Sequence, residues 1–144
     1  IQRYRARLSG PLADRIDLHV RIGAVKLATL GELATDEPSS AVAARVVAAR
    51  ARQTARYRVL PGVRLNAEAP GRWLQQHGLL TSEAKSLLGE AADRLRLSAR
   101  AFHRALRVAR TVADLDGDER VGTGAIAEAL MFRAGDSQPP GGGG

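Results

Sequence analysis

The stretch SARAFHRALRVARTVADLDG, residues 98–117, decides the fold. Ser98 is a good N-cap residue, because its hydroxyl can accept a hydrogen bond from a free amide of the first turn. Apolar residues then recur at intervals of three and four, namely Phe102, Leu106, Ala109, Val112 and Ala113. This spacing predicts an amphipathic helix. Gly117 stands where a left-handed residue commonly ends such a helix.

The sequence on both sides of this stretch predicts more helices. They are expected over residues 39–57, 71–77, 82–95 and 123–133. The candidate N-caps are Ser39 or Ser40, Thr81 or Ser82, and Thr123. The expected buried face of the first helix consists of Val42, Val46, Ala49 and Gln53. Segments rich in Gly, Pro and Asn predict a connector over 23–38 and a loop over 58–71. The expected fold class is therefore mainly α, a bundle of four to five helices.

One segment, IDLHVRI at residues 16–22, alternates apolar and polar residues. Ile16, Leu18 and Val20 fall on one side, and Asp17 and His19 on the other, which predicts a half-buried strand. A single strand cannot form a sheet, so we expect it to be left over from an α/β core. The start IQRYRAR likewise indicates a piece of a longer protein.

Three regions follow from this organisation. Residues 1–30 are expected to end an α/β core, residues 31–134 to form a helical domain, and residues 135–144 to be a disordered tail. The chain contains no cysteine, which excludes disulfides and thiolate metal sites. The three histidines lack metal-ligand spacing, so no metal site is expected. No apolar run reaches about 20 residues, so we expect no membrane association and a cytoplasmic location.

The chain is basic, with a formal net charge of +7 in 144 residues. All of its 22 basic residues except Lys26 and Lys85 are arginine, and an arginine-biased genome would also give this composition. Arg45, Arg52 and Arg56 fall together on one face of the helix expected at 39–57. That stripe is either a solvated face or a surface that meets phosphates or another subunit. It makes these three residues candidates for contact with nucleic acid.

Two other arginines are candidates for phosphate chemistry. Arg100 lies in the first turn of the helix that Ser98 begins, where a cation opposes the helix dipole at a cost of up to about 1 kcal/mol. The position makes sense if an anion binds there, although Arg100 could also extend into water or meet Asp93. Arg15 directly precedes the alternating segment, and between two acidic neighbours it could equally form a surface ion pair. The acidic residues from Asp114 to Glu119 are attributed to solvation and turn formation.

Two runs carry a family resemblance: ARLSGPLADRIDLHV at 6–20 and LRLSARAFHRALRVARTVADLDGDERVGTGAIAEALMFR at 95–133. They resemble the C-terminal third of the magnesium-chelatase-like ATPases of the AAA+ class, in the YifB/ComM branch. The resemblance spans nearly the whole chain and matches poorly only in the connector and the loop. The departures are Ala13, where the family favours Leu, and Phe102 in place of Tyr.

The resemblance implies roles for the two candidate arginines. Arg15 matches the arginine finger, which reaches the ATP of the neighbouring subunit, and Arg100 matches the sensor-2 residue, which contacts the γ-phosphate in its own subunit. The full-length protein would use ATP and Mg²⁺, pair this lid with its own upstream AAA+ core, and form a homo-oligomeric ring of six subunits. The parent would be a DNA-acting motor for helicase or branch-migration work.

Several elements of an ATPase are absent from this sequence. No GxxxxGK[ST] loop occurs to hold the phosphates, and no strand ends in an acidic residue suited to Mg²⁺. We therefore expect the 144-residue chain alone to bind no cofactor tightly and to hydrolyse no ATP. Two alternatives stay open. One is an autonomous basic DNA-binding helical module, and the other is the lid of a true magnesium chelatase ATPase subunit.

Overall fold

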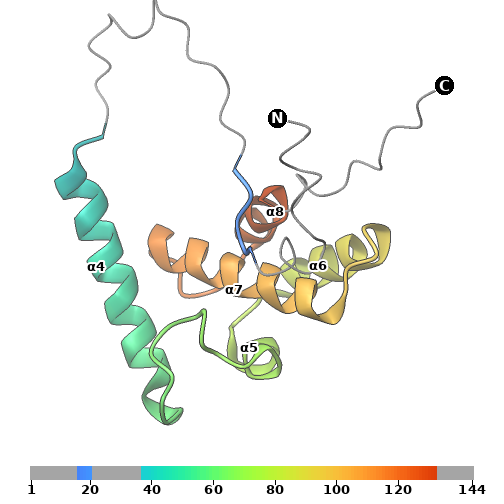
Figure 1. The fold of residues 1–144 in the computed structure, drawn as a ribbon, viewed down its shortest axis with the longest axis horizontal. Coiled ribbons are helices and arrows are strands. Elements are labelled where there is room, and N and C mark those ends of the chain that lie inside the picture. Colours follow the sequence, from blue (N-terminus) through green and yellow to red (C-terminus); the bar gives the residue numbers. More distant parts are fainter. Residues whose placement is uncertain (1–15, 21–36, 133–144) are drawn as a thin grey trace, which may run out of the picture.

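The computed structural model describes residues 16–20 and 37–132, and within them the protein is a helical bundle (Figure 1). Its elements are α4 (Ser39–Arg56), the 3₁₀ turn η1 (Tyr57–Val59), α5 (Gly71–His77), α6 (Ser82–Arg94), α7 (Ala99–Asp116) and α8 (Thr123–Met131). The mainly helical fold class is confirmed. The expected tail lies outside the described residues. No helix in the described part is long and apolar enough to cross a membrane.

Helix α7 is the centre of the bundle, as its sequence indicates. It packs against α4, α5 and α8, while α6 packs against α8 (Figure 1). The fully buried apolar side chains include Leu74, Leu88, Leu106, Val121 and Ile126. These come from α5, α6, α7, the loop before α8, and α8 itself, so every element after α4 contributes a large side chain to one core.

Local chemistry explains where the helices begin and end. The Ser98 hydroxyl accepts a hydrogen bond from the amide of Ala101 at 3.2 Å, and Gly117 ends α7 with φ of 87°. Thr81, rather than Ser82, caps α6 by accepting from the amide of Ala84 at 3.1 Å. The predicted cap at Ser98 and end at Gly117 are thus confirmed.

Two of the predicted side-chain caps are wrong. Pro38 and Gly122 occupy the N-cap positions of α4 and α8, and neither has a side chain that could accept a hydrogen bond. Ser39 and Thr123 are the first helical residues instead. Pro38 has a ψ of 143°, which is extended rather than helical, so the helix begins only at the next residue.

The strand predicted at 16–22 is not formed in its described part, residues 16–20. Within the described residues, the one β-bridge joins Leu80 and Val121. A strand needs a partner for its backbone groups, and none of the described elements lies alongside as one. The segment is instead attached to the bundle, where the His19 amide donates to the Phe132 carbonyl at 3.0 Å. Its apolar residues Ile16, Leu18 and Val20 are exposed.

Helix α4 is buried along only part of its length. Ala49 and Gln53 are buried as predicted, but Val42 and Val46 from the same expected face are exposed. The side-chain hydrogen bonds from α4 to α7 come from Arg52 and Arg56, in the C-terminal half of α4. The periodicity identified the correct face but could not show where the partner helix ends.

The closest approach of α5 to α7 gives a first prediction. Gly71 begins α5 and is buried, and a Cβ atom there would lie 2.2 Å from Cγ of His103 on α7. Gly71→Ala is therefore expected to destabilise the chain by about 1–3 kcal/mol, because the His103 ring or the helices themselves must shift to make room for the added methyl group. Gly89→Ala is the matched control, since its Cβ meets nothing within 4 Å in the interior of α6. Gly89→Ala should raise the free energy of unfolding by about 0.5–1 kcal/mol. Urea unfolding measures both variants, and equal unfolding midpoints for Gly71→Ala and Gly89→Ala would contradict the prediction.

Candidate functional site

Arg100 lies in the first turn of α7, at the end where backbone amides lack helical partners. It is exposed, and no acidic residue occupies that turn. Within the described residues, no hydrogen bond or ion pair engages its guanidinium group, and the alternative contact with Asp93 is not formed. Arg100 thus presents a free positive charge beside an amide-rich helix end, an arrangement suited to an anion.

The arginine stripe of α4 does not act as one surface. Arg45 is exposed and forms an ion pair with Glu37 at 2.8 Å. Arg52 instead donates to the backbone carbonyl of Asp114 at 3.3 Å, and Arg56 donates to the carboxylate of the same residue. Arg45 and Arg52 are therefore both exposed, although each has a protein partner, while Arg56 is largely buried against α7.

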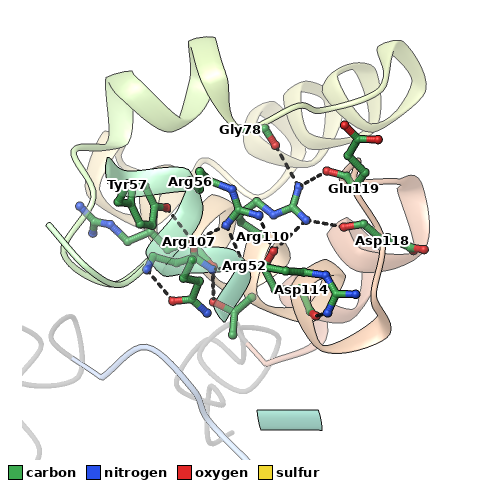
Figure 2. Close-up of polar contacts among 12 residues, drawn as sticks. Arg52, Arg56, Tyr57, Gly78, Arg107, Arg110, Asp114, Asp118 and Glu119 are labelled. Atoms are coloured by element: carbon green, nitrogen blue, oxygen red, sulfur yellow. Dashed lines mark hydrogen bonds and ion pairs between the residues drawn. The ribbon is translucent and has the colours of Figure 1, made fainter. Parts of the chain in front are cut away.

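Asp114 is the centre of a buried polar cluster, which Figure 2 shows in detail. Its side chain is completely buried and lies in the last turns of α7. One oxygen accepts from Arg56 and from Arg110 at 3.1 Å, and the other accepts from Arg56 and from Asn66, each at 2.8 Å. This single carboxylate therefore connects α4, α7 and the loop between α4 and α5.

The charges in the cluster affect one another. Burial lowers the pKa of Arg56, but hydrogen bonding and attraction to Asp114 outweigh it, so the pKa is raised overall. Burial dominates at Arg110 and lowers its pKa, despite the same carboxylate. Burial also raises the pKa of Tyr57, whose hydroxyl donates to Asn66 Oδ1 at 2.6 Å. Two arginines share one carboxylate, so the cluster carries an excess positive charge that carbonyl groups must offset.

Arg110 supplies that compensation through backbone groups (Figure 2). Its side chain is fully buried, and it donates to the carbonyls of Asp118 at 2.7 Å, Glu119 at 2.8 Å and Gly78 at 3.3 Å. The first two lie in the corner between α7 and α8, and the third ends α5. Arg110 consequently holds two connections of the bundle, the corner between α7 and α8 and the end of α5.

A second buried arginine of α7 contacts the segment at residues 16–20. The Arg104 side chain is only 6% exposed, and its Nε lies 3.6 Å from Oδ1 of Asp17, which is 54% exposed. Arg104 follows Arg100 by four residues, so both occupy the same side of α7. Arg15, the other predicted phosphate ligand, precedes this segment directly but lies outside the described residues.

Comparison with known proteins decides the family. Residues 36–133 match the family described as magnesium chelatase, subunit ChlI C-terminal, and residues 1–30 match magnesium chelatase, subunit ChlI. The chain belongs to the magnesium-chelatase-like family. The first match covers all of the described helices, so this fold is the family's C-terminal helical domain.

Similar full-length proteins place this magnesium-chelatase-like chain in the predicted branch. It is 38% identical over 133 residues to YifB of Salmonella typhimurium and 40% identical over 132 residues to Rv2897c of Mycobacterium tuberculosis. It is 34% identical over 135 residues to the competence protein ComM of Haemophilus influenzae. These alignments cover 92–93% of the chain but only 25–26% of each relative. The chain therefore spans about a quarter of their length.

Sequence reasoning missed the buried cluster of this magnesium-chelatase-like domain. Asp114 was attributed to solvation at a helix end, which is wrong, because its side chain is fully buried. The available signal was its spacing: Arg110 and Asp114 are four residues apart and lie beside Leu106 and Ala113 on the apolar side of α7. Within the described residues, no group of three or more His, Cys, Asp or Glu residues could hold a metal ion.

Proposed function

We propose that this chain is the lid region of an ATP-hydrolysing ring motor and completes ATP sites built mainly by other parts of the protein. The observation that carries the proposal is the unengaged Arg100 at the start of α7. A γ-phosphate is the anion that such a site would receive. Arg100 would donate hydrogen bonds to its oxygens, and the charge would stabilise the transition state of phosphoryl transfer.

The fit between this end of α7 and a phosphate rests on three features. Free amides point out of the first turn, the helix dipole is positive there, and no acidic side chain competes for Arg100. Arg100 alone could not bind a nucleotide tightly, because the sequence has no phosphate-cradling loop. The ATP and its Mg²⁺ would be held by an upstream AAA+ core, which the greater length of the relatives supports.

Arg15 would be the arginine finger that enters the ATP site of the next subunit. The separate match of residues 1–30 to the chelatase subunit supports a division between a core end at 1–30, a helical lid at 31–134 and a tail at 135–144. A finger that acts on a neighbour requires a ring, for which we propose six subunits. We further propose a cytoplasmic motor that acts on DNA, consistent with the net charge of +7.

The alternatives have less support. An autonomous DNA-binding module would rely on the α4 stripe, but Arg52 and Arg56 are bonded to Asp114. Arg45 is likewise paired, with Glu37, so each arginine of the stripe already has a protein partner. A true magnesium chelatase subunit shares the family description, and insertion of Mg²⁺ into a porphyrin by the longer protein would favour it. Salt-dependent DNA binding by the 144-residue chain alone would favour the module.

The test of the proposed site uses a protein of the relatives' length that contains this chain. Arg100→Ala is expected to lower ATP turnover by about 10²–10³-fold, the usual cost of one donor to developing charge. Arg94→Ala is the matched control, since Arg94 is also exposed and lies in the last turn of α6. The control should retain turnover. Equal activity of the two variants would remove the proposed role of Arg100.

A further inference from the structure

Arg104 forms a contact that the needs of the helical core do not explain. Its guanidinium is almost entirely buried, yet its anionic partner Asp17 is half exposed and belongs to a segment far away in sequence. Burial of an arginine is unfavourable unless an anion or acceptors compensate for lost water. Asp17 is one of the groups that can provide this compensation, and the pair joins the segment at residues 16–20 to α7.

A second attachment fixes the same segment. The His19 amide donates to the carbonyl of Phe132, directly after α8, at 3.0 Å. The two contacts lie only two residues apart in the sequence, one made by a side chain and the other by a backbone amide. The neighbours Ile16, Leu18 and Val20 are exposed. The segment is thus attached at two points, through the Asp17 carboxylate and through the His19 backbone amide.

The position of this attachment links the two arginines of the proposed function. Arg104 lies one helical turn after Arg100, and Asp17 lies two residues after Arg15. We propose that Arg104 is a positioning residue, which, through Asp17, orients the segment carrying Arg15 relative to the helix carrying Arg100. The inference rests on the proposed function, because it assumes that Arg15 reaches a nucleotide. Arg104 itself touches no substrate in this proposal.

A purely stabilising role predicts a different result. Removal of the Asp17 charge takes an anion away from a buried guanidinium and should lower the unfolding midpoint. A purely stabilising contact would show that loss alone, whereas the positioning role also requires release of the segment from α7. Asp17→Asn removes the charge with little change in shape, and Asp17→Glu keeps it. Asp116→Asn is the matched control, since Asp116 is exposed at the far end of α7.

The attachment can be tested in the 144-residue chain without any nucleotide. The chain has no cysteine, so Val20→Cys and Glu90→Cys, both at exposed positions, allow two spin labels to be placed selectively. Pulsed EPR should give a narrow distance distribution for the labelled parent, Asp17→Glu and Asp116→Asn. Asp17→Asn should broaden the distribution at least twofold at a temperature well below its thermal midpoint, where the bundle is still folded. An equally narrow distribution for Asp17→Asn would overturn the attachment.

The catalytic consequence is tested in the longer ATPase. Asp17→Asn should lower kcat by about 10–100-fold with KM unchanged, since misplacement of a catalytic group by about 1 Å has effects of this size. Asp17→Glu should restore turnover, and Asp17→Asn should add no further loss to Arg15→Ala. Full activity of Arg15→Ala would defeat the proposed finger, whatever the label distances show. An active Asp17→Asn beside an inactive Arg15→Ala would defeat the positioning role alone.

Discussion

The 144-residue chain carrying Asp114→Ala is expected to lose about 3–5 kcal/mol of its free energy of unfolding. This would be a large part of the 5–15 kcal/mol typical of a domain. The substitution removes the carboxylate that faces both Arg56 and Arg110, and the two cations would remain side by side in the core. Asn66 would also lose the acceptor of its side-chain amide.

The same experiment contains its own comparison. Asp116→Ala changes an exposed aspartate in the last turn of the same helix and should alter stability by no more than about 0.5 kcal/mol. Urea unfolding followed by far-ultraviolet circular dichroism measures both variants. Asp114→Asn, which keeps the shape but not the charge, should fall between them. Midpoints for Asp114→Ala and Asp116→Ala that coincide would show that the cluster contributes nothing to the fold.

The second large effect is expected at Arg15, under the proposed function. In a protein of the relatives' length, Arg15→Ala should lower ATP turnover by about 10³–10⁵-fold, the range typical of an arginine finger. The folded lid should be unaffected. Arg7→Ala, which removes an equal charge from the same region of sequence, is the control and should retain turnover.

Mixing of subunits tests whether Arg15 acts on a neighbour. Subunits with Arg15→Ala retain Arg100 in their own ATP site, whereas subunits with Arg100→Ala retain Arg15 for the ATP site of the neighbouring subunit. A ring that contains the two variants should regain ATP turnover. Where an Arg100→Ala subunit supplies Arg15 to the ATP site of an Arg15→Ala neighbour, that site contains Arg15 and Arg100 together. Two inactive variants that stay inactive when mixed, despite forming mixed rings, would show that Arg15 does not act across an interface.

The helices could be predicted because their signals are local. In α7, a capping serine, apolar residues at helical spacing and a final glycine all lie within one stretch, and Ser98 and Gly117 perform the expected roles. The strand at 16–22 could not be judged in this way. Alternation indicates which side chains share a face, but formation of a strand depends on a partner that the sequence pattern does not supply.

In the candidate site, too, features set by the local sequence could be predicted and features set by distant contacts could not. The exposed position of Arg100 followed from its place beside a helix cap. The fates of Arg52 and Arg56 could not be predicted from α4, because their acceptor, Asp114, lies about 60 residues further along the chain. Helical spacing placed these arginines on one face, but tertiary packing determined whether that face met water or protein.

The carbonyl contacts of Arg110 have a mechanical consequence. They hold the corner between α7 and α8 from inside, and they also hold the end of α5 at Gly78. A torque applied at the Arg100 end of α7 would therefore not be absorbed by bending at that corner. The helices around Arg110 should rotate together as a rigid body. A displacement at the N-terminal end of α7 would therefore be transmitted to the opposite side of the domain.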